Sequence, residues 1–450
     1  MTAPLRDVAR VGRKLLVRPE RFLLLAPPAL YDLDLPRQTP PAPPATHHTE
    51  EPAYEQRAHA GLRSFLGQEF GNETADDVVQ RIDRFRLPIP DDETRGANKL
   101  DCSEADAVAW AARIARRASH RIDPDATPDV SIVVPVYNQV AFTLACIDAL
   151  MAHDSRYRFE ILVGDDASTD ATTRALENPI NGVRHVRHDS NLGFVRNCNA
   201  TAQLARGRYV VLLNNDTLVL PGWLDELVGV LERSPDIGLA GSKLIYPDGR
   251  LQECGGIVWR DGSAWNFGRM DDPRHPQYCY LRDTDYVSGA SIALSRELWT
   301  QLGGFDELFV PAYAEDVDLA FRVRAQGLRT VVQPLSQLLH FEGISSGTDL
   351  GQGAKAYQVE NLRKLHERWR PVLERHRDNA DHPELEKERS VSRRMLFVDM
   401  VTPTPNEDAG SLVAWEMMTA FRDSGFKLTF IPEDNFAHMG ASTRELQRIG

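Results

Sequence analysis

The sequence has 450 residues, of which 42% are hydrophobic and 26% are charged, and this is the composition of an ordinary globular protein. Because this length exceeds that of one typical domain, we expect two or three folded units. The 52 basic and 65 acidic residues leave a net charge of −13, so the protein as a whole has no electrostatic reason to bind nucleic acid or an anionic membrane. An anionic ligand would need a site that is built locally.

The N-terminal 52 residues begin with a basic and then apolar stretch. The apolar run from Phe22 is broken by Pro27 and Pro28, and it falls short of the ~18 uninterrupted apolar residues of a membrane span. This start is compatible with peripheral contact with a membrane surface or with a signal peptide. It lacks a clear cleavage site, so we favour a docked or frayed segment. Residues 36–52 are rich in proline, which predicts an extended linker.

Residues 53–127 show helical periodicity, with Ser103 as a candidate N-cap, and predict a small helical region. From residue 128 short β-branched runs alternate with helical segments. This alternation predicts an α/β domain over residues 128–375, with parallel strands and helices on both faces.

The C-terminal part of the sequence repeats the strand and helix pattern after a charged stretch. Residues 376–392 are interpreted as a second linker, and residues 393–450 as the first βαβ unit of a second Rossmann-like domain. About 60 residues cannot bury such a core alone, so we expect the chain to be a piece of a longer one.

The five cysteines lie far apart, and none of them forms a C-x-x-C pair. Their odd number and their spacing argue against a disulfide framework and against a structural zinc site. A reducing compartment fits this usage best, so we expect a cytoplasmic protein.

Polar side chains follow three of the predicted strands at the point where each strand ends. They are Tyr137 and Asn138 after "SIVVPV", Asp165 and Asp166 after "ILVG", and Asn215 and Asp216 after "VVLLN". Ligands of open α/β sheets bind beyond the carboxyl ends of the strands. A divalent cation completed by nucleotide phosphates is an economical ligand there, because Mg²⁺ and Mn²⁺ favour oxygen. Each pair alone would also fit a turn or a helix N-cap.

Five ordered motifs between residues 128 and 345 resemble those of family-two glycosyltransferases. They read "VSIVVPVYNQ", "VGDDASTD", "NLGFVRNCNATAQLARGRYVVLLNNDT", "VSGASIALSRELWTQLGGFDELF" and "EDVDLAFR". The resemblance implies the GT-A fold, a Rossmann-like mixed sheet flanked by helices, and inverting transfer of a sugar from a nucleotide donor to a hydroxyl. It also implies that Asp166 binds the pyrimidine base and that Asp216, the last residue of the family's DXD motif, holds Mn²⁺ or Mg²⁺.

The DXD motif reads Asn214-Asn215-Asp216 here, so its first carboxylate is missing, although many sugar transferases of this type carry only the last aspartate. The nucleotide site that we expect from the strand ends and the resemblance consists of Pro135, Tyr137, Asn138, Asp165, Asp166, Asn215 and Arg196.

Glu315 and Asp316 open a predicted helix, where acids also complement the helix dipole by ~0.3–1 kcal/mol. By resemblance Asp316 is the general base, and Glu315 orients the acceptor or the base. His340 ends an apolar run and would be structural if it stood alone, but the resemblance makes it a metal ligand, which suits Mn²⁺ better than Mg²⁺. Trp299 and Asp306 are acceptor-binding by resemblance, while their segment also fits a helix C-cap and turn.

The segment "YPDGRLQECGGIVWRDGSAWNFG" and the N-terminal extension look like those of large bacterial transferases that build O-antigen or capsule. The C-terminal segment looks like the start of a GT-B, family-four-like glycosyltransferase. These resemblances imply a dTDP- or UDP-sugar donor, with rhamnose as one candidate. They also imply a polysaccharide or lipid-linked glycan acceptor, used at the inner face of the cell membrane.

Two rival interpretations remain. A nucleotidyltransferase would carry a glycine-rich basic loop after its first strand, and "PVYNQVAF" has neither feature. A catalytically inactive nucleotide- or glycan-binding scaffold in a polysaccharide assembly complex would have no need of Asp216, Glu315-Asp316 and His340 together.

Overall fold

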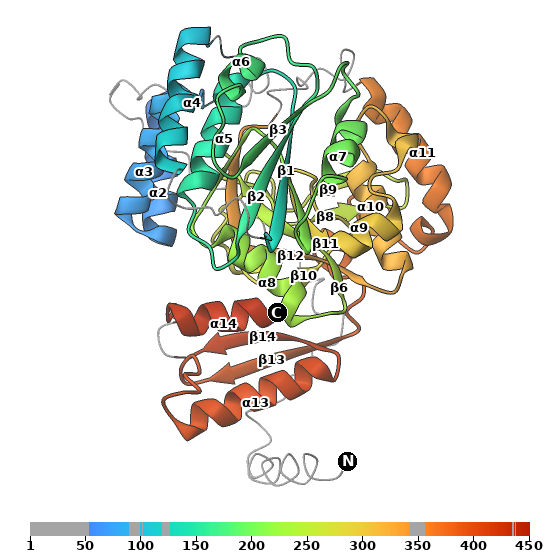
Figure 1. The fold of residues 1–450 in the computed structure, drawn as a ribbon. Helices are drawn as coiled ribbons and strands as arrows, with labels where there is room; N and C mark the ends of the chain where they lie inside the picture. Colours follow the sequence, from blue (N-terminus) through green and yellow to red (C-terminus); the bar gives the residue numbers. More distant parts are fainter. Residues whose placement is uncertain are drawn as a thin grey trace, which may run out of the picture. The chain divides into compact units, whose positions relative to one another are not determined.

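The computed structural model describes residues 54–89, 100, 102–118, 127–342, 356–433, 436 and 438–450. The predicted N-terminal segment and its proline-rich linker lie outside these residues. The chain divides into two compact units, one formed by Ala53–Glu388 and one that includes Arg389–Gly450 (Figure 1).

The larger unit is built on one mixed sheet, in which the strand order is β10-β12-β6-β11-β4-β1-β2-β3. Its main strands are β1 (Val130–Val136), β2 (Phe159–Asp165), β3 (Val183–Arg187), β4 (Tyr209–Leu213), β5 (Thr217–Val219), β6 (Ile237–Ile245), β11 (Ser291–Ser295) and β12 (Arg329–His340). Strands β3, β2, β1 and β4 run parallel, as the alternation of strands and helices predicts. Strand β11 runs antiparallel to β4 and β6, so the expected α/β fold with a mixed sheet is confirmed.

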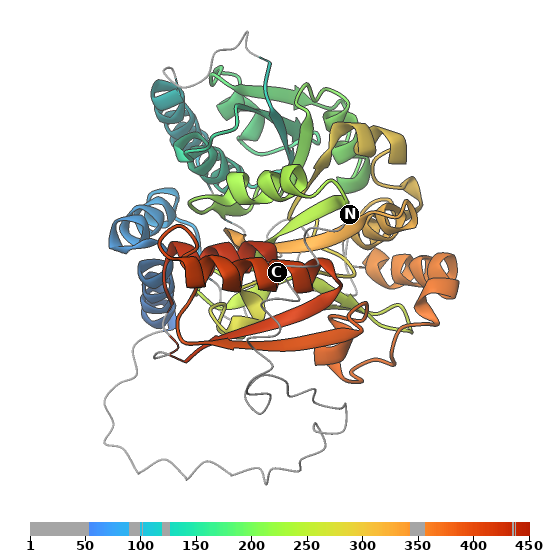
Figure 2. The same cartoon turned by 90° about the horizontal axis from the view of Figure 1, so that it is seen from below.

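Helices flank this sheet, and the most deeply buried of them is α5, in which nearly every residue is apolar. The helices that follow the first strand are α5 (Val140–Ala152), α6 (Thr172–Leu176), α7 (Phe194–Ala202), α8 (Trp223–Arg233), α9 (Arg296–Leu302), α10 (Glu315–Ala325), α11 (Ala356–Leu373) and α12 (Pro383–Glu386). Figure 2 shows α2 and α3 at one flank of the sheet and α11 at the other. Helix α7 packs against β1 and β2, and α10 packs against β6 and β12.

The residues before the sheet form α2 (Tyr54–Phe70), α3 (Asn72–Phe85) and α4 (Glu104–Ala118). Ser103 accepts a hydrogen bond from the Asp106 backbone N–H at 3.1 Å, which confirms its predicted N-cap role. Helices α3 and α4 pack on α5. A buried ion pair fixes this contact, because Arg81 Nε of α3 lies 2.9 Å from Asp148 Oδ2 of α5.

An insertion between β6 and β11 contains four short strands and a 3₁₀ turn. These are β7 (Leu251–Glu253), β8 (Gly256–Val258), β9 (Ala264–Asn266), η3 (Pro276–Tyr278) and β10 (Arg282–Asp283). Strands β8 and β9 form an antiparallel hairpin. The Tyr286 ring packs directly on the hairpin at Gly256, where a Cβ atom would lie 1.8 Å from the ring. Only glycine fits this position.

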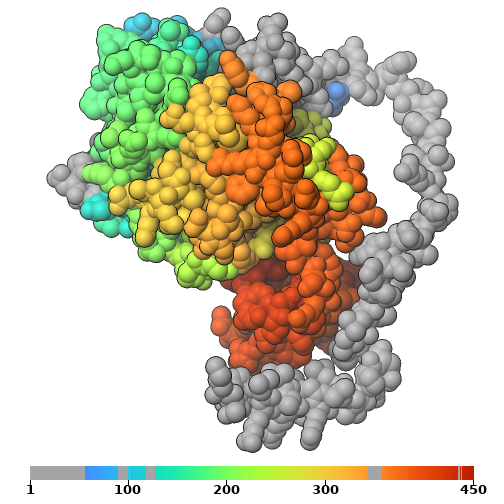
Figure 3. Space-filling model, turned by 90° about the vertical axis from the view of Figure 1, so that its right-hand side faces the viewer, coloured from blue at the N-terminus to red at the C-terminus, as the bar shows by residue number. Residues whose placement is uncertain are grey.

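Helix α11 contacts the segment that precedes α10, and Figure 3 shows the orange part of the chain beside the yellow part that comes before it. Asn361 donates hydrogen bonds to the carbonyls of Phe309 and Ala312, both at 2.8 Å. Most of the predicted second linker, residues 376–392, is folded as part of the larger unit, since it contains α12 and since Tyr280 donates a hydrogen bond to Glu388 at 2.6 Å. Buried amides and carboxylates therefore hold this end of the larger unit in place.

The smaller unit contains β13 (Arg393–Asp399), α13 (Ala409–Asp423), β14 (Phe426–Pro432) and α14 (Ala441–Ile449). The two strands pair in parallel, which is the βαβ arrangement expected for this segment. Asp408 caps α13 by accepting a hydrogen bond from the Ser411 N–H at 2.8 Å.

No helix within the described ranges has both the length and the apolar character needed to cross a membrane.

Candidate active site

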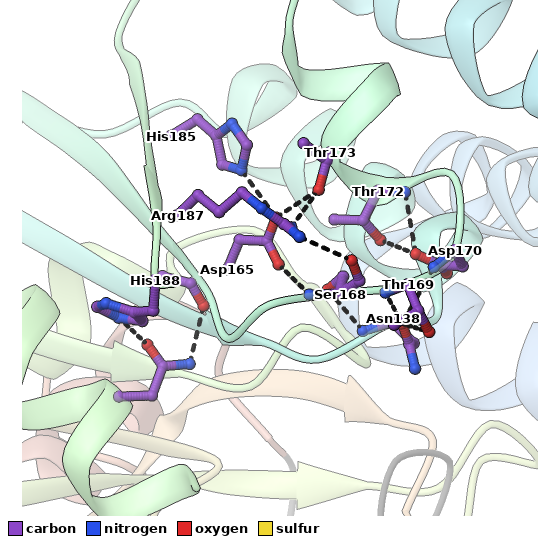
Figure 4. A network of polar contacts seen from close by, with 12 residues as sticks. Asn138, Asp165, Ser168, Thr169, Asp170, Thr172, Thr173, His185, Arg187 and His188 are labelled. Carbon is purple, nitrogen blue, oxygen red and sulfur yellow. Dashed lines mark hydrogen bonds and ion pairs between the residues drawn. The ribbon is translucent and has the colours of Figure 1, made fainter. Parts of the chain in front are cut away.

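The ends of β1 and β2 are joined by a network of polar contacts centred on Asn138 and Asp165 (Figure 4). Asn138 Oδ1 accepts hydrogen bonds from the backbone N–H groups of Thr169 at 2.7 Å and Asp170 at 3.2 Å. Asp170 in turn accepts a hydrogen bond from the Val140 N–H at 3.0 Å, at the start of α5. Tyr137 beside this network is 42% exposed, so it is free to meet a ligand.

Asp165 is fully buried and saturated with donors. Its Oδ1 accepts from the Ser168 N–H at 2.8 Å, and its Oδ2 accepts from Arg187 Nη1 at 2.8 Å and Thr173 Oγ1 at 2.9 Å. His185 Nε2 lies 3.1 Å from the same oxygen. Burial alone would raise the pKa of Asp165, but the bonds from His185, Ser168 and Thr173 outweigh it and hold the pKa well below its usual range. This geometry gives Asp165 a role in building the loop.

Asp166 faces the N-terminus of α7. Its two oxygens accept hydrogen bonds from the backbone N–H groups of Leu192 at 2.7 Å and Gly193 at 2.9 Å. Burial raises the pKa of Asp166, and the two backbone bonds oppose that rise. Pro135 lies within buried β1, level with Gly164 of β2. Asp166 can therefore bind a ligand group only with lone pairs that these amides leave free.

Asn215 and Asp216 lie between β4 and β5, as the strand-end prediction requires. Asn215 Nδ2 donates to Thr143 Oγ1 of α5 at 3.0 Å, which anchors the turn. Asp216 Oδ1 lies 3.2 Å from His340 Nε2, although the two strand ends are far apart in sequence. Gln252 Oε1 lies 3.1 Å from the other ring nitrogen of His340 and fixes the orientation of the ring.

Two features of Asp216 and His340 fit a divalent cation. Asp216 Oδ1 is buried, and it accepts no hydrogen bond from the described residues. Burial alone would lower the pKa of His340, but Asp216 and Glu342 outweigh burial and raise it, so the site favours positive charge. Within the described ranges no third His, Cys, Asp or Glu completes a metal cluster. The remaining ligands would come from phosphate oxygens and water.

Glu315 and Asp316 form the first turn of α10. Asp316 Oδ2 accepts the Gly289 N–H at 3.0 Å, and Oδ1 accepts the Val317 N–H at 2.8 Å. Burial raises the pKa of Asp316, with these backbone bonds opposing the rise. Burial, and then the charge of Asp316, raise the pKa of Glu315 well above its ordinary value. Glu315 Oε2 is buried and has no hydrogen-bond partner among the described residues.

Backbone bonds connect the candidate metal pair to the candidate base. The Asn214 N–H donates to the Ala290 carbonyl at 3.0 Å, and Ala290 follows the Gly289 amide that binds Asp316. The turn that carries Asp216 and the first turn of α10 therefore meet on the same short segment, 288–290.

Glu253, the last residue of β7, was not predicted from the sequence as a site residue, and it is 1% exposed. Its Oε1 accepts a hydrogen bond from the Ser288 N–H at 3.1 Å. The next amide along the chain, that of Gly289, binds Asp316. Burial raises the pKa of Glu253 to about 8, and the charges of Asp316 and His340 also act on it. Gln252 was missed as well. No motif marks either residue, because only the pairing of β7 with β6 brings them to the site.

Three predicted site residues have other partners in the structure. Arg196 pairs with Glu307, with 2.9 Å between Nη2 and Oε2. Trp299 is buried, and its ring packs against Phe305 with centroids 5.4 Å apart. Asp306 caps the short helix η4 (Glu307–Phe309), and its Oδ2 lies 2.6 Å from Arg368. These contacts favour the alternative helix-end and turn interpretation for Trp299 and Asp306.

The mixed sheet defines an α/β domain, and its strand ends carry acidic residues and an Asp–His pair that are candidates for nucleotide and metal binding. Residues 131–268 match the model of Glycosyl transferase family 2, and residues 209–372 match that of Glycosyl transferase family group 2. This part of the chain therefore resembles family 2 glycosyltransferases, which supports the prediction of a nucleotide-sugar-dependent transferase.

The chain is similar to two curated relatives that have named roles. O-antigen biosynthesis protein RfbC of Myxococcus xanthus is 35% identical over 235 residues, which are 50% of this chain and 18% of the relative. N-acetylglucosaminyl-diphospho-decaprenol L-rhamnosyltransferase of Mycobacterium tuberculosis is 28% identical over 246 residues, 47% of this chain and 78% of the relative. The chain thus spans less than a fifth of the Myxococcus protein.

A solved structure, GalNAc-T7 with UDP, GalNAc and Mn²⁺, is 18% identical to this chain. The likeness covers 68% of this chain and 65% of that one, with a TM-score of 0.44.

Proposed function

We propose that the protein transfers a sugar from a dTDP- or UDP-sugar to a hydroxyl of a growing bacterial surface polysaccharide, with inversion and with Mn²⁺ or Mg²⁺ as cofactor. The observation that carries the proposal is the juxtaposition at segment 288–290. The turn that carries Asp216 hydrogen-bonds to this segment, and so does the Asp316 carboxylate. The Asp216 carboxylate in turn lies 3.2 Å from His340. The named roles of the two relatives support the polysaccharide setting, and the rhamnosyltransferase supports rhamnose as the first sugar to test.

In the proposed reaction Asp316 accepts the proton of the acceptor hydroxyl while that oxygen bonds to the anomeric carbon and the bond to the diphosphate breaks. The amides of Gly289 and Val317 hold the Asp316 carboxylate in place. Asp216 and His340 would hold the cation, which supplies positive charge to the departing diphosphate. Glu315 helps to orient the base or the acceptor.

Nucleotide recognition is assigned to the ends of β1 and β2. Tyr137 is exposed beside the loop that Asn138 and Asp165 build, and Asp166 is proposed to meet the base. The five cysteines, all free in the structure, support a reducing cytosol, and the acceptor class supports work at the inner membrane face.

The test is transfer from dTDP- and UDP-sugars with Mn²⁺, Mg²⁺ or chelator. We expect metal-dependent transfer that Asp316→Asn lowers by ~10²–10⁴-fold, the usual contribution of a positioned base. Asp216→Ala should abolish metal-dependent nucleotide binding in calorimetry. Nucleotide binding by the wild type without transfer to any acceptor, and without an effect of Asp316→Asn, would favour the inactive scaffold instead.

We also propose that β13, α13 and β14 begin a GT-B-like glycosyltransferase domain, so that the protein carries two transfer activities. The parallel pair with its crossover helix supports this assignment. The test is a second sugar transfer that persists in Asp316→Asn, and a single activity lost in that variant would contradict it.

A further inference from the structure

A groove of about 490 Å³ lies along the β8–β9 hairpin and the turn that follows it. This volume falls within the ~300–1,000 Å³ of typical small-molecule sites. We call it the hairpin groove, and the lining residues used below are Trp265, Asn266, Arg269, Met270 and Asp271. None of these five residues belongs to the candidate active site.

The lining of the hairpin groove combines an open aromatic ring with fixed polar groups. Trp265 is 40% exposed, and it rests edge-on against the fully buried Trp259, with centroids 5.0 Å apart. Such a ring offers a rigid surface at little cost in conformational entropy. Arg269 and Asp271 add a donor fork and an acceptor, and their opposite charges leave the lining near neutral. An aromatic face beside hydroxyl-binding groups suits the C–H face and hydroxyl rim of a pyranose.

Side-chain contacts link one side of the groove to the candidate metal site. Arg269 Nη2 lies 3.7 Å from Glu342 Oε2, and Tyr246 donates a hydrogen bond to the same oxygen at 2.8 Å. Glu342 follows His340 by two residues at the end of β12. Arg269 therefore connects the groove to the strand end that carries His340.

The groove also borders the segment that positions the base. The Tyr286 hydroxyl donates to Asn266 Oδ1 at 2.8 Å, and Tyr286 lies two residues before Ser288. The backbone of β7, which ends in Glu253, pairs with the groove wall, since the Met270 N–H donates to the Leu251 carbonyl at 2.8 Å. Both walls of the groove thus connect to segment 288–290.

We propose that the hairpin groove binds the saccharide chain of the acceptor, several sugar units from the hydroxyl that reacts. The inference rests on the proposed function, because it assigns the acceptor of that same reaction to a surface. Its role is to use binding energy from remote sugar units to hold the reacting hydroxyl at Asp316. The occupant is an uncharged or weakly charged oligosaccharide, in keeping with the near-neutral lining.

The experiment measures saccharide binding by calorimetry without any sugar donor, so its outcome does not depend on turnover. The probes are a monosaccharide and a linear tetrasaccharide of L-rhamnose, and the same pair for N-acetylglucosamine. We expect one tetrasaccharide to bind the wild type at least tenfold more tightly than its monosaccharide. Trp265→Ala should lower that affinity by tenfold or more, and Arg269→Ala by about threefold to tenfold.

Tyr357→Ala is the matched control, because Tyr357 is a 51% exposed aromatic residue on α11 outside the groove. This variant should bind the tetrasaccharide with the affinity of the wild type. The unfolding temperature of each variant shows whether it is folded. The groove proposal would be overturned if neither tetrasaccharide bound better than its monosaccharide. Unchanged affinity in folded Trp265→Ala and Arg269→Ala would overturn it as well. Failure of the wild type to turn over any nucleotide-sugar, with tetrasaccharide binding intact, would overturn the proposed function and leave the groove standing.

Discussion

Replacing Asp165 with asparagine separates a structural role from nucleotide binding. Asparagine has nearly the shape of aspartate, but it carries one carbonyl oxygen and an NH₂ group where the carboxylate has two acceptor oxygens. If that oxygen keeps the bond to the Ser168 N–H, the new NH₂ group faces Thr173, His185 and Arg187. The substitution therefore replaces the acceptor oxygen Oδ2 by a donor NH₂ group, which faces the three donors Thr173, His185 and Arg187.

The size of the loss follows from which of these donors can adapt. The Thr173 hydroxyl can rotate and His185 can change tautomer, so both can accept a bond from the amide. The Arg187 guanidinium has no acceptor and loses its contact at 2.8 Å. A hydrogen bond to a charged group contributes ~1.5–3 kcal/mol, and the remaining bonds weaken without the charge. We expect unfolding of the Ala53–Glu388 unit to become easier by about 2–4 kcal/mol.

Thermal unfolding followed by circular dichroism measures this loss. At an unfolding entropy of about 2.1 cal/mol/K per residue, a unit of this length should melt roughly 3–6 °C lower. Asp189→Asn is the control, because it removes an exposed carboxylate nearby and should leave the melting temperature unchanged. The pKa of Asp165 is held below its usual range, so its stabilisation is present above the ordinary value of about 3.9 and is lost as pH falls further. Wild type should therefore lose more stability below pH 4 than Asp165→Asn does.

A melting temperature of Asp165→Asn within 1 °C of the wild type, combined with a tenfold loss of nucleotide affinity, would refute this reasoning. Such a result would indicate that Asp165 contacts the nucleotide, as the strand-end pattern predicts.

Four further predictions concern the site and the hairpin beside it. Glu253 is expected to position the Ser288 backbone through its hydrogen bond. Glu253→Gln keeps an acceptor for the Ser288 N–H and should retain most of kcat, while Glu253→Leu should lower kcat tenfold or more with little change in the donor KM. Equal losses of kcat in both variants would contradict this positioning role. Because the pKa of Glu253 is raised to about 8, the folded protein holds a proton that the unfolded chain releases. In urea titrations the stability of the wild type should therefore fall from pH 5 to pH 8, and that of Glu253→Gln should fall less. Gly256→Ala would place a methyl group 1.8 Å from the Tyr286 ring and should melt at least several degrees lower, and unchanged melting would show that the ring can move aside. The raised pKa of Asp316 places the acid limb of the kcat/KM profile above about pH 4, with activity lost as pH falls through it, and a limb at or below pH 4 would argue against Asp316 as the base.

The positions of the strand-end residues could be predicted from the sequence because two general rules apply to them. Alternating strands and helices give parallel pairing, and the carboxyl ends of parallel strands meet at one edge. These rules bring Asn138, Asp166 and Asp216 to that edge without any knowledge of their neighbours. The first turn of α10 was predicted from its acids and from the apolar pattern that follows.

What the sequence could not show is how individual side chains are used. Asp165 and Asp166 are adjacent in sequence, yet His185 and Arg187 of β3 engage the first carboxylate while two backbone amides engage the second. Glu253 reaches the site only because β7 folds back along β6, and no local pattern predicts that pairing.

The ion pair between Arg81 and Asp148 determines where the catalytic domain can be trimmed. The Asp148 side chain is buried in α5, and its partners include Arg81 and Arg84 of α3. A polypeptide shortened to begin near residue 128, where the strand pattern starts, would keep the aspartate and lose both arginines of α3. An unpaired buried charge of this kind costs about 3–5 kcal/mol, and the apolar outer face of α5 would meet water as well. For expression and crystallisation, the minimal autonomous piece should therefore start before α3, upstream of residue 72.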